Sequence, residues 1–298
     1  MTEITNEQKA MQDGLNGKPP APPPEPLAPY EEALPYSKYY YREMARPNPE
    51  LMGILAQGPM DPDKALPLSE IDKLLDPGYH EVETGYCITN DGLGYVAVNN
   101  VFPGCTIEMM RWWFVWHAAG GNLRYRIWCP PCHKAIAVSD QDKRKIADPN
   151  VPFADKFTNV AHFVVEDCGG GDENILIRFK KVRDMGFDME KYADSPTKEI
   201  IGGYGTSEFR FAPAAFKAPA VMFHTMRETE SGIEFRTRFW MGARIVEGKA
   251  YNVTPPWVKI PIQAPMGLAF HNVVEYSNLA SFLPEIYAEY KDKPLTED

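Results

Sequence analysis

The sequence predicts an α+β fold in which a curved antiparallel sheet grips a long C-terminal helix over a cavity. Two hairpin patterns support the sheet, one across Asn90-Asp-Gly92 and one across Glu230-Ser-Gly232. The helix is predicted from about Ile262 to Lys291, in a stretch rich in apolar residues. The predicted strands therefore precede an apolar helix whose surface must be buried, and burial of this helix against the sheet is the basis of the fold prediction.

The N-terminal part of the chain differs in composition from the rest. Residues 1–35 are rich in proline and predict a flexible leader, with a polyproline II stretch that begins at Lys18. Residues 36–78 predict a small N-terminal region whose short helices, at 49–57 and 68–75, are separated by prolines. Residues 79–298 are then expected to form the main domain.

Within the main domain, strands are predicted at 79–88 and 94–102, on either side of the Asn90 turn. A buried helix is expected at 106–119, which is dense in methionine, tryptophan and phenylalanine. Residues 125–128 predict a short extended segment, and 140–146 a polar helical turn.

The second half of the chain predicts further strands. They cover residues 159–167, 174–182, 221–229 and 233–245. The final helix contains Pro284, so we expect it in two parts.

Composition excludes several classes of protein. The 298 residues carry a net charge of −10, which argues against nucleic acid or an anionic membrane as the main partner. The first residues show no apolar run that would form a secretory signal, and no stretch approaches the ~18–20 apolar residues of a membrane span. We therefore expect a cytoplasmic protein whose five cysteines are reduced.

The most informative local pattern is the pair His271 and Glu275. Residues four apart share one face of a helix, and the apolar residues around this pair mark that face as directed to the core. A buried carboxylate is costly unless it is paired or bound to a metal. Such pairs also occur as simple surface couples, so the pair alone leaves both interpretations open.

Other candidate ligands lie on different elements. His117 ends a tryptophan-rich run, where a neutral imidazole is favoured that either binds a metal or only hydrogen-bonds a carbonyl. His162 and Glu166 share one face of a predicted strand, which faces either the cavity or solvent. Together His117, Glu166, His271 and Glu275 would form a site for zinc, with iron or manganese as alternatives.

The segment Cys129-Pro-Pro-Cys132-His133 matches the c-type haem attachment pattern. Haem attachment would need export, a structural zinc site would need a second Cys/His pair, and two adjacent prolines disfavour a thioredoxin-like site. We interpret the segment as a tight turn beside the cavity. No partner pattern separates His133 from a structural residue.

Five stretches carry a family resemblance, and they read Trp112-Trp113-Phe-Val-Trp-His117, Arg124-Tyr-Arg-Ile-Trp128, Val164-Val-Glu166, Arg238-Phe-Trp240-Met-Gly242 and His271-Asn-Val-Val-Glu275. Together they resemble the 2,4-diacetylphloroglucinol hydrolase and phloretin hydrolase family over roughly residues 35–290. The resemblance implies a helix-grip domain at 79–298, like the birch-pollen allergen and START folds. It also implies that residues 36–78 mediate homodimerisation.

The resemblance further implies an activity. These enzymes hydrolyse the carbon–carbon bond between an acyl carbonyl and a polyphenol ring, so an aromatic ketone is the expected substrate. The reaction uses zinc, Zn2+, held by two histidines and two glutamates, which match His117, Glu166, His271 and Glu275 here. Asp148, His162 and Asp167 are the alternatives to Glu166.

Roles in catalysis and substrate binding are also implied. A proton relay would fall to Glu275 or His162, and the candidates for binding substrate are Asn122, Tyr125 and Trp240. The alternative function is a helix-grip protein that binds aromatic molecules without turnover. A haem or redox protein that uses Cys129 and Cys132 is the third alternative. Bound metal would distinguish the enzyme from the binding protein.

Overall fold

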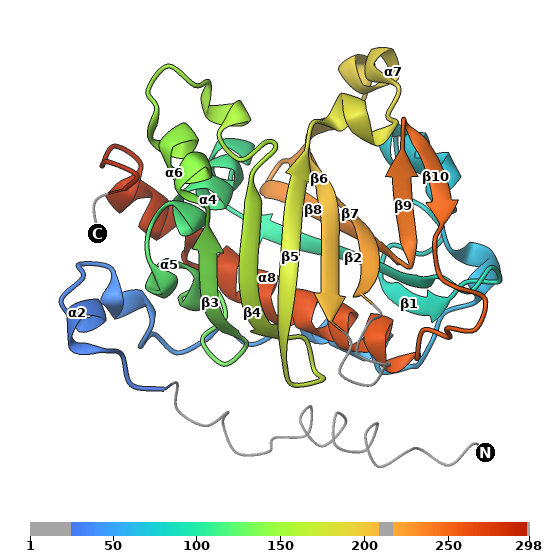
Figure 1. Ribbon diagram of the computed structural model, residues 1–298, viewed down its shortest axis with the longest axis horizontal. Coiled ribbons are helices and arrows are strands. Elements are labelled where there is room, and N and C mark those ends of the chain that lie inside the picture. Colours follow the sequence, from blue (N-terminus) through green and yellow to red (C-terminus); the bar gives the residue numbers. More distant parts are fainter. Residues whose placement is uncertain (1–24, 209–216, 297–298) are drawn as a thin grey trace.

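An eight-stranded antiparallel sheet curves around helix α8 in the computed structural model, which describes residues 25–208 and 217–296 (Figure 1). The strand order is β1-β2-β8-β7-β6-β5-β4-β3. The strands are β1 (Gly85–Ile88), β2 (Gly94–Pro103), β3 (His133–Val138), β4 (Ala161–Asp167), β5 (Asp172–Lys180), β6 (Thr197–Glu208), β7 (Lys217–Thr229) and β8 (Gly232–Met241). The helix α8 is Gln263–Tyr290, and the α+β helix-grip fold is as predicted.

The remaining elements surround this sheet. Helices α4, α5 and α6 gather where β3 and β4 lie, and a separate hairpin of β9 and β10 follows β8 (Figure 1). Their bounds are α2 (Pro29–Glu32), η1 (Ser37–Tyr39), α3 (Pro49–Leu55), η2 (Pro62–Lys64), η3 (Leu68–Leu75), α4 (Ile107–Ala119), α5 (Asn122–Arg126), α6 (Asp140–Ala147), η4 (Phe153–Asp155), η5 (Val182–Met185), α7 (Met189–Asp194), β9 (Ala243–Val246) and β10 (Lys249–Asn252). Within the described residues, no helix combines the length and apolar character that crossing a membrane requires.

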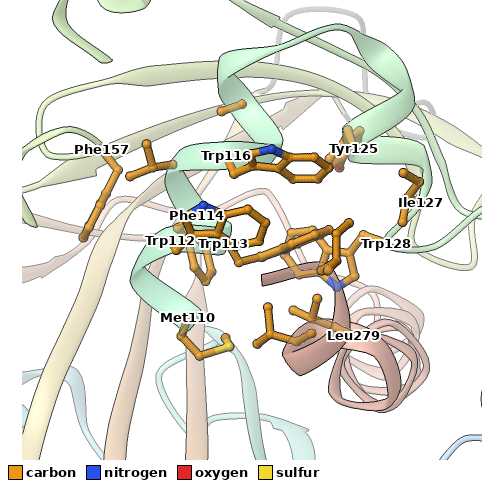
Figure 2. Packing of buried hydrophobic residues seen from close by; sticks show 14 of the residues in the cluster. Met110, Trp112, Trp113, Phe114, Trp116, Tyr125, Ile127, Trp128, Phe157 and Leu279 are labelled. Atoms are coloured by element: carbon orange, nitrogen blue, oxygen red, sulfur yellow. The ribbon is translucent and has the colours of Figure 1, made fainter. Parts of the chain in front are cut away.

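Helix α4 forms the centre of the aromatic core. It begins at Thr106, whose hydroxyl accepts a hydrogen bond from the amide of Met109, as expected of an N-cap. Its tryptophans Trp112, Trp113 and Trp116 are buried (Figure 2). Trp113 packs edge-on against Phe282 of α8 at 5.6 Å between ring centroids. Each such aromatic pair adds about 0.5–1.5 kcal/mol beyond the burial of its area. These contacts hold α4 and α8 together around the cavity.

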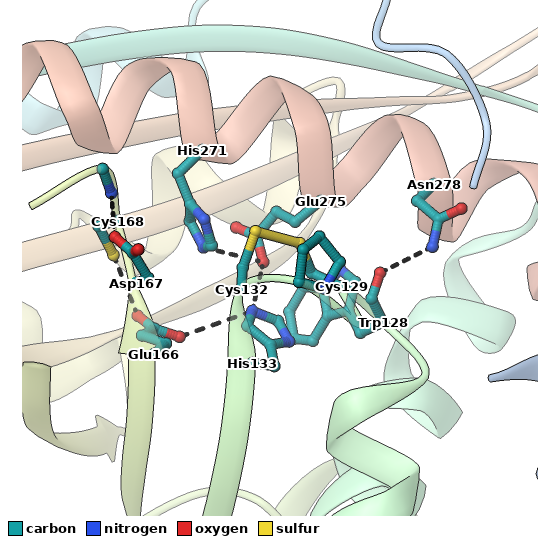
Figure 3. Close-up of a disulfide and its surroundings, with 12 residues drawn as sticks. Trp128, Cys129, Cys132, His133, Glu166, Asp167, Cys168, His271, Glu275 and Asn278 are labelled. Atoms are coloured by element: carbon teal, nitrogen blue, oxygen red, sulfur yellow. Dashed lines mark hydrogen bonds and ion pairs between the residues drawn. A yellow bond between two sulfur atoms is a disulfide. The ribbon is translucent and has the colours of Figure 1, made fainter. Parts of the chain in front are cut away.

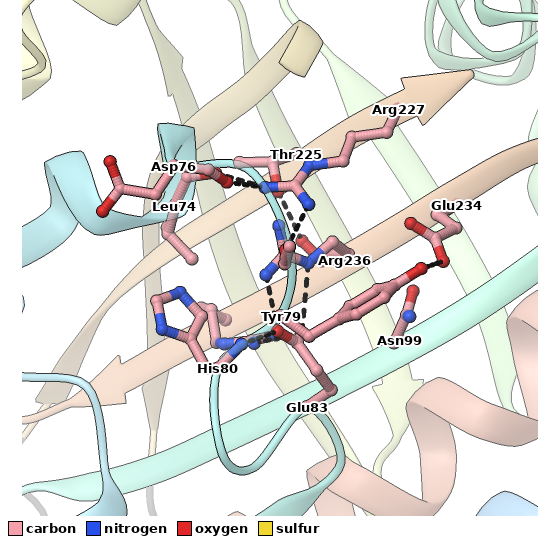
Figure 4. A network of polar contacts seen from close by, with 12 residues as sticks. Leu74, Asp76, Tyr79, His80, Glu83, Asn99, Thr225, Arg227, Glu234 and Arg236 are labelled. Atoms are coloured by element: carbon pink, nitrogen blue, oxygen red, sulfur yellow. Dashed lines mark hydrogen bonds and ion pairs between the residues drawn. The ribbon is translucent and has the colours of Figure 1, made fainter. Parts of the chain in front are cut away.

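The outer face of the sheet buries an ion pair. Arg236 on β8 contacts the Glu83 carboxylate at 2.5 Å (Figure 4), and Arg238 on the same strand contacts it at 2.6 Å. These ion pairs tie the chain before β1 to the sheet. Burial opposes ionisation of Glu83, but the two guanidinium groups outweigh it and lower its pKa to about 2. The neighbouring Trp240 points the same way, and its indole donates to the carbonyl oxygen of Leu66 at 2.8 Å.

Most of the predicted elements are confirmed, and three predictions differ from the structure. Residues 122–126 form helix α5, so an extended segment at 125–128 was wrong. The strand predicted at 233–245 is divided at Gly242, whose φ of 88° ends β8. Helix α8 continues through Pro284 instead of forming two parts. In addition, strands β3, β6 and β10 were not predicted.

Two further expectations concern the leader and the cysteines. The polyproline II prediction lies in residues 1–24, outside the described part, whereas Leu27 is buried in the core. Cys129 and Cys132 are paired in a disulfide, which corrects the expectation that all five cysteines are reduced. Cys87, Cys105 and Cys168 are free.

Candidate functional site

A cavity of about 230 Å³ lies between the inner face of the sheet and α8. Five of the six histidines of the chain line it: His117, His133, His162, His224 and His271. Apolar and aromatic side chains form most of the remaining wall. A mainly apolar cavity lined by five imidazoles is the best candidate for a functional site.

His133, His271 and Glu275 form a group whose possible ligand atoms all lie within 4.8 Å of one another. The Nε2 atom of His133 is 3.5 Å from a carboxylate oxygen of Glu275 and 3.6 Å from one of Glu166 (Figure 3). His271 Nε2 is 3.8 Å from the same Glu275 oxygen. Glu166 belongs to a second, overlapping group with Cys168 and His271, so two imidazoles and two carboxylates lie close together in this part of the cavity.

Two local structures bring these residues together. On α8, the spacing of four residues aligns His271 with Glu275, as the sequence predicts. On the sheet, antiparallel pairing places His133 of β3 directly opposite Glu166 of β4. The turn before β3 is closed by the carbonyl oxygen of Cys129, which accepts hydrogen bonds from the amides of Cys132 and His133. The site is thus built between the last strand pair of the sheet and the helix.

Both histidines of the group are uncharged. His133 Nδ1 lies 3.1 Å from the carbonyl oxygen of Tyr125, so it carries the proton and leaves Nε2 with a free lone pair. Burial, together with the neighbouring His271, lowers the pKa of His133 well below its usual range. Burial also lowers the pKa of His271. His133 Nε2 is buried without a hydrogen-bond partner among the described residues.

The carboxylates provide the opposite charge. Burial, followed by the nearby Glu166 carboxylate, raises the pKa of Glu275 well above its usual range. The hydroxyl of Tyr125 donates a hydrogen bond to Glu166. Two neutral imidazoles and two carboxylates match the charge and donor preference of a divalent metal such as zinc. The unpartnered His133 nitrogen and this charge balance show that the residues fit a metal.

The structure places His133, rather than His117, in this group. The Nδ1 atom of His117 donates to the carbonyl oxygen of Trp113 at 2.7 Å, and its ring packs against Trp128 in the cavity wall. Among the described residues, His117 belongs to no candidate metal cluster. The signal that would have identified His133 is the strand that follows it, because its pairing with Glu166 orients the imidazole.

Among the predicted carboxylates, Glu166 lines the cavity. Asp148 instead caps the end of α6 and accepts a hydrogen bond from the amide of Asn150. Asp167 accepts hydrogen bonds from the amides of two glycines in the β4–β5 turn. Neither aspartate competes with Glu166 for the cluster.

The other predicted residues divide into two groups. Tyr125 and His162 line the cavity, although His162 lies four residues from Glu166, or about 13 Å along a strand. The proton relay by His162 stays a prediction, and this spacing along β4 does not place it in the group around Glu275. Asn122 is exposed and accepts a hydrogen bond from the amide of Ile136, and Trp240 lies on the outer face of the sheet. Neither lines the cavity, because successive strand residues such as Phe239 and Trp240 point to opposite faces.

Comparisons with known proteins find relatives that cover most of the chain. The family model described as DAPG hydrolase PhiG domain matches residues 66–288. A phloretin hydrolase from Eubacterium ramulus is 36% identical over 88% of this chain and 92% of its own length. A 2,4-diacetylphloroglucinol hydrolase from Pseudomonas protegens is 26% identical over 86% of this chain and 84% of its own. The solved structure of Ara h 8.0201 aligns at a TM-score of 0.36 and 9% identity, over 65% of this chain and 99% of that one.

Proposed function

Because this chain belongs to the DAPG hydrolase family, we propose that it is a zinc-dependent hydrolase that cleaves the carbon–carbon bond between an acyl group and a polyhydroxylated aromatic ring. The observation that carries the proposal is the buried group of His133, Glu166, His271 and Glu275 in an aromatic cavity. The relatives are named as hydrolases of phloretin and of 2,4-diacetylphloroglucinol, both of which are acylated phloroglucinols.

The four residues would hold the metal, with His133 in the position that the sequence assigned to His117. Zinc bound there would polarise an acyl carbonyl and lower the pKa of water toward neutrality. Tyr125 fixes the Glu166 carboxylate through its hydroxyl and supports His133 by stacking on its ring at 4.0 Å. The mainly apolar wall lowers the local dielectric constant, which strengthens electrostatic interactions within the site.

The leaving group explains the need for a polyhydroxylated ring. Breaking the bond expels a ring carbon as a carbanion, which a plain arene does not stabilise. A 1,3,5-trihydroxylated ring can adopt a keto tautomer, so the leaving carbanion becomes an enolate. That carbon must then receive a proton. Glu275 is our candidate for moving it, because its carboxylate lies between both imidazoles and faces the cavity.

Two measurements test the proposal. Purified protein should contain about one zinc per chain by elemental mass spectrometry. It should also release phloroglucinol and the corresponding acid from phloretin or an acetylphloroglucinol. A metal-free protein with an intact cavity that binds these ketones without cleaving them would instead favour the non-catalytic binding protein.

The role of Glu275 has its own test. Glu275→Gln should lower kcat more than it lowers zinc content if Glu275 moves a proton, because the amide cannot accept one. Equal losses of activity and zinc would assign Glu275 as a ligand only.

The proposal extends to assembly and location. We retain the predictions that residues 36–78 mediate a homodimer and that the enzyme works in the cytoplasm. In the structure, Tyr36, Tyr39 and Tyr40 of this region pack into the core of their own chain. Light scattering coupled to size-exclusion chromatography would test the dimer, and a monomer at micromolar concentration would contradict it.

A further inference from the structure

Three of the five histidines that line the cavity lie outside the candidate metal centre. Two of them have partners, because His117 Nδ1 donates to the Trp113 carbonyl oxygen at 2.7 Å and His224 Nδ1 lies 2.9 Å from the hydroxyl of Thr237. The third, His162, is only 2% exposed, and its Nε2 atom has no hydrogen-bond partner in the described part of the chain. Buried polar atoms are nearly always paired, so this nitrogen requires an explanation.

The position of His162 separates it from the metal centre. His162, Val164 and Glu166 point to the same face of β4, and all three line the cavity. The strand rise sets His162 and Glu166 about 13 Å apart, with the apolar Val164 between them. The cavity therefore extends along β4 from the metal centre to a second polar position.

Aromatic rings enclose this second position. The ring of Phe179 on β5 lies 4.9 Å from His162, and the ring of His117 lies 5.4 Å away. Phe114 on α4 packs edge-on to Phe179 at 6.1 Å. These walls suit a flat apolar group, and they leave the His162 nitrogen as the polar group at its end.

The charge state of His162 defines the polar group it would recognise. Burial and the neighbouring His117 lower its pKa well below the usual range, so the imidazole is neutral. A neutral imidazole nitrogen pairs with a hydroxyl in either tautomer, since a hydroxyl both donates and accepts. A carboxylate or ammonium group would need a counter-charge that this wall does not supply.

We propose that His162 is a specificity-determining residue, which binds a hydroxyl on an aromatic ring at the far end of the acyl chain. The ring would lie along Phe114 and Phe179, with its hydroxyl on His162 Nε2. This inference rests on the proposed function, because it places the reacting carbonyl at the metal centre. The roughly 13 Å between His162 and Glu166 along β4 favours a hydroxyl on the acyl chain, rather than one on the phloroglucinol ring, as the group that reaches His162. In a 3-(4-hydroxyphenyl)propanoyl group, seven bonds separate the carbonyl carbon from the phenolic oxygen, whereas five separate it from the farthest ring hydroxyl.

The test compares two ketones that differ by one hydroxyl. Phloretin carries the 3-(4-hydroxyphenyl)propanoyl group, and its analogue carries 3-phenylpropanoyl on the same phloroglucinol ring. Wild-type enzyme should favour phloretin in kcat/KM by about tenfold or more, because the analogue leaves the nitrogen unpaired. His162→Phe, which keeps an aromatic ring, should reduce this ratio to about one.

A matched control is available in the same wall. His117→Phe should keep the preference for phloretin, because the proton-bearing nitrogen of His117 already has a backbone partner. The proposal would be overturned if only His117→Phe lost the preference for phloretin. It would also be overturned if His162→Phe lowered kcat/KM for phloretin and for the analogue by the same factor. If His162→Phe does not fold, the wild-type ratio decides, since equal kcat/KM values for the two ketones refute the inference.

Binding separates this inference from the proposed function. Both ketones should be titrated into chelator-treated protein, with tryptophan fluorescence as the readout. If the untreated enzyme cleaves neither ketone but the chelator-treated protein binds phloretin more tightly in a His162-dependent way, the proposed function fails and the subsite stands. If both are cleaved and bound equally, the function stands and the subsite fails.

Discussion

Replacing His133 and His117 separately by phenylalanine tests the assignment of the metal centre. Phenylalanine keeps a ring in each position, so the packing of His133 on Tyr125 and of His117 on Trp128 is largely preserved. Only His133→Phe removes a nitrogen from the group around Glu275. We therefore expect His133→Phe to lose metal and His117→Phe to retain it.

The expected magnitude follows from the number of ligands. Apparent binding free energies of four-ligand zinc sites are about 10–16 kcal/mol. Shared among four ligands, this is roughly 3 kcal/mol each, or about a hundredfold in the dissociation constant. His117→Phe breaks only a hydrogen bond to a helix carbonyl, so its zinc affinity should stay within about threefold of wild type.

Competition with a chromophoric chelator would measure the zinc affinity, and elemental mass spectrometry would measure the zinc retained after dialysis. Circular dichroism would confirm that both variants fold. Retention of wild-type affinity by His133→Phe, with loss in His117→Phe, would refute the structural assignment and restore the one made from sequence.

Three further predictions address the surroundings of the site and the fold. Tyr125→Phe removes the hydroxyl that orients Glu166, and should weaken zinc binding about 10–100-fold in the same competition assay without changing the melting temperature greatly. Glu83 has a folded-state pKa of about 2 against an ordinary 4.5, so it contributes roughly 3 kcal/mol to stability above pH 4.5, and this is lost as the pH falls toward 2. Urea unfolding should thus separate wild type from Glu83→Gln at pH 6 more than at pH 3, and an equal difference at both would contradict the ion pair. Alkylation of denatured, unreduced protein should modify three cysteines and spare Cys129 and Cys132, and modification of all five would show that this pair is reduced.

Much of the fold could be predicted because its signals are local. The period of two in β2 and β4, and the hairpin across Glu230 and Gly232, depend on neighbouring residues only. Strand β3 escaped prediction because it is six residues long and follows a turn with two prolines. Helix α5 was misassigned because the aromatic residues near Tyr125 favour strands by propensity, while tertiary packing favoured a helical turn.

The candidate site likewise has features that follow from local sequence and features that depend on tertiary structure. By itself, the sequence determined that His271 and Glu275 share a helix face and that Glu166 and His162 share a strand face, because both follow from the periodicity of one element. Only the tertiary structure decided that His133 lies beside His271 and Glu275. Its position depends on the pairing of β3 with β4, which places His133 opposite Glu166 although a long stretch of chain separates the two strands. The tertiary structure also decided that β8 turns Trp240 away from the cavity, because the choice of the inner face depends on what each side of the sheet packs against.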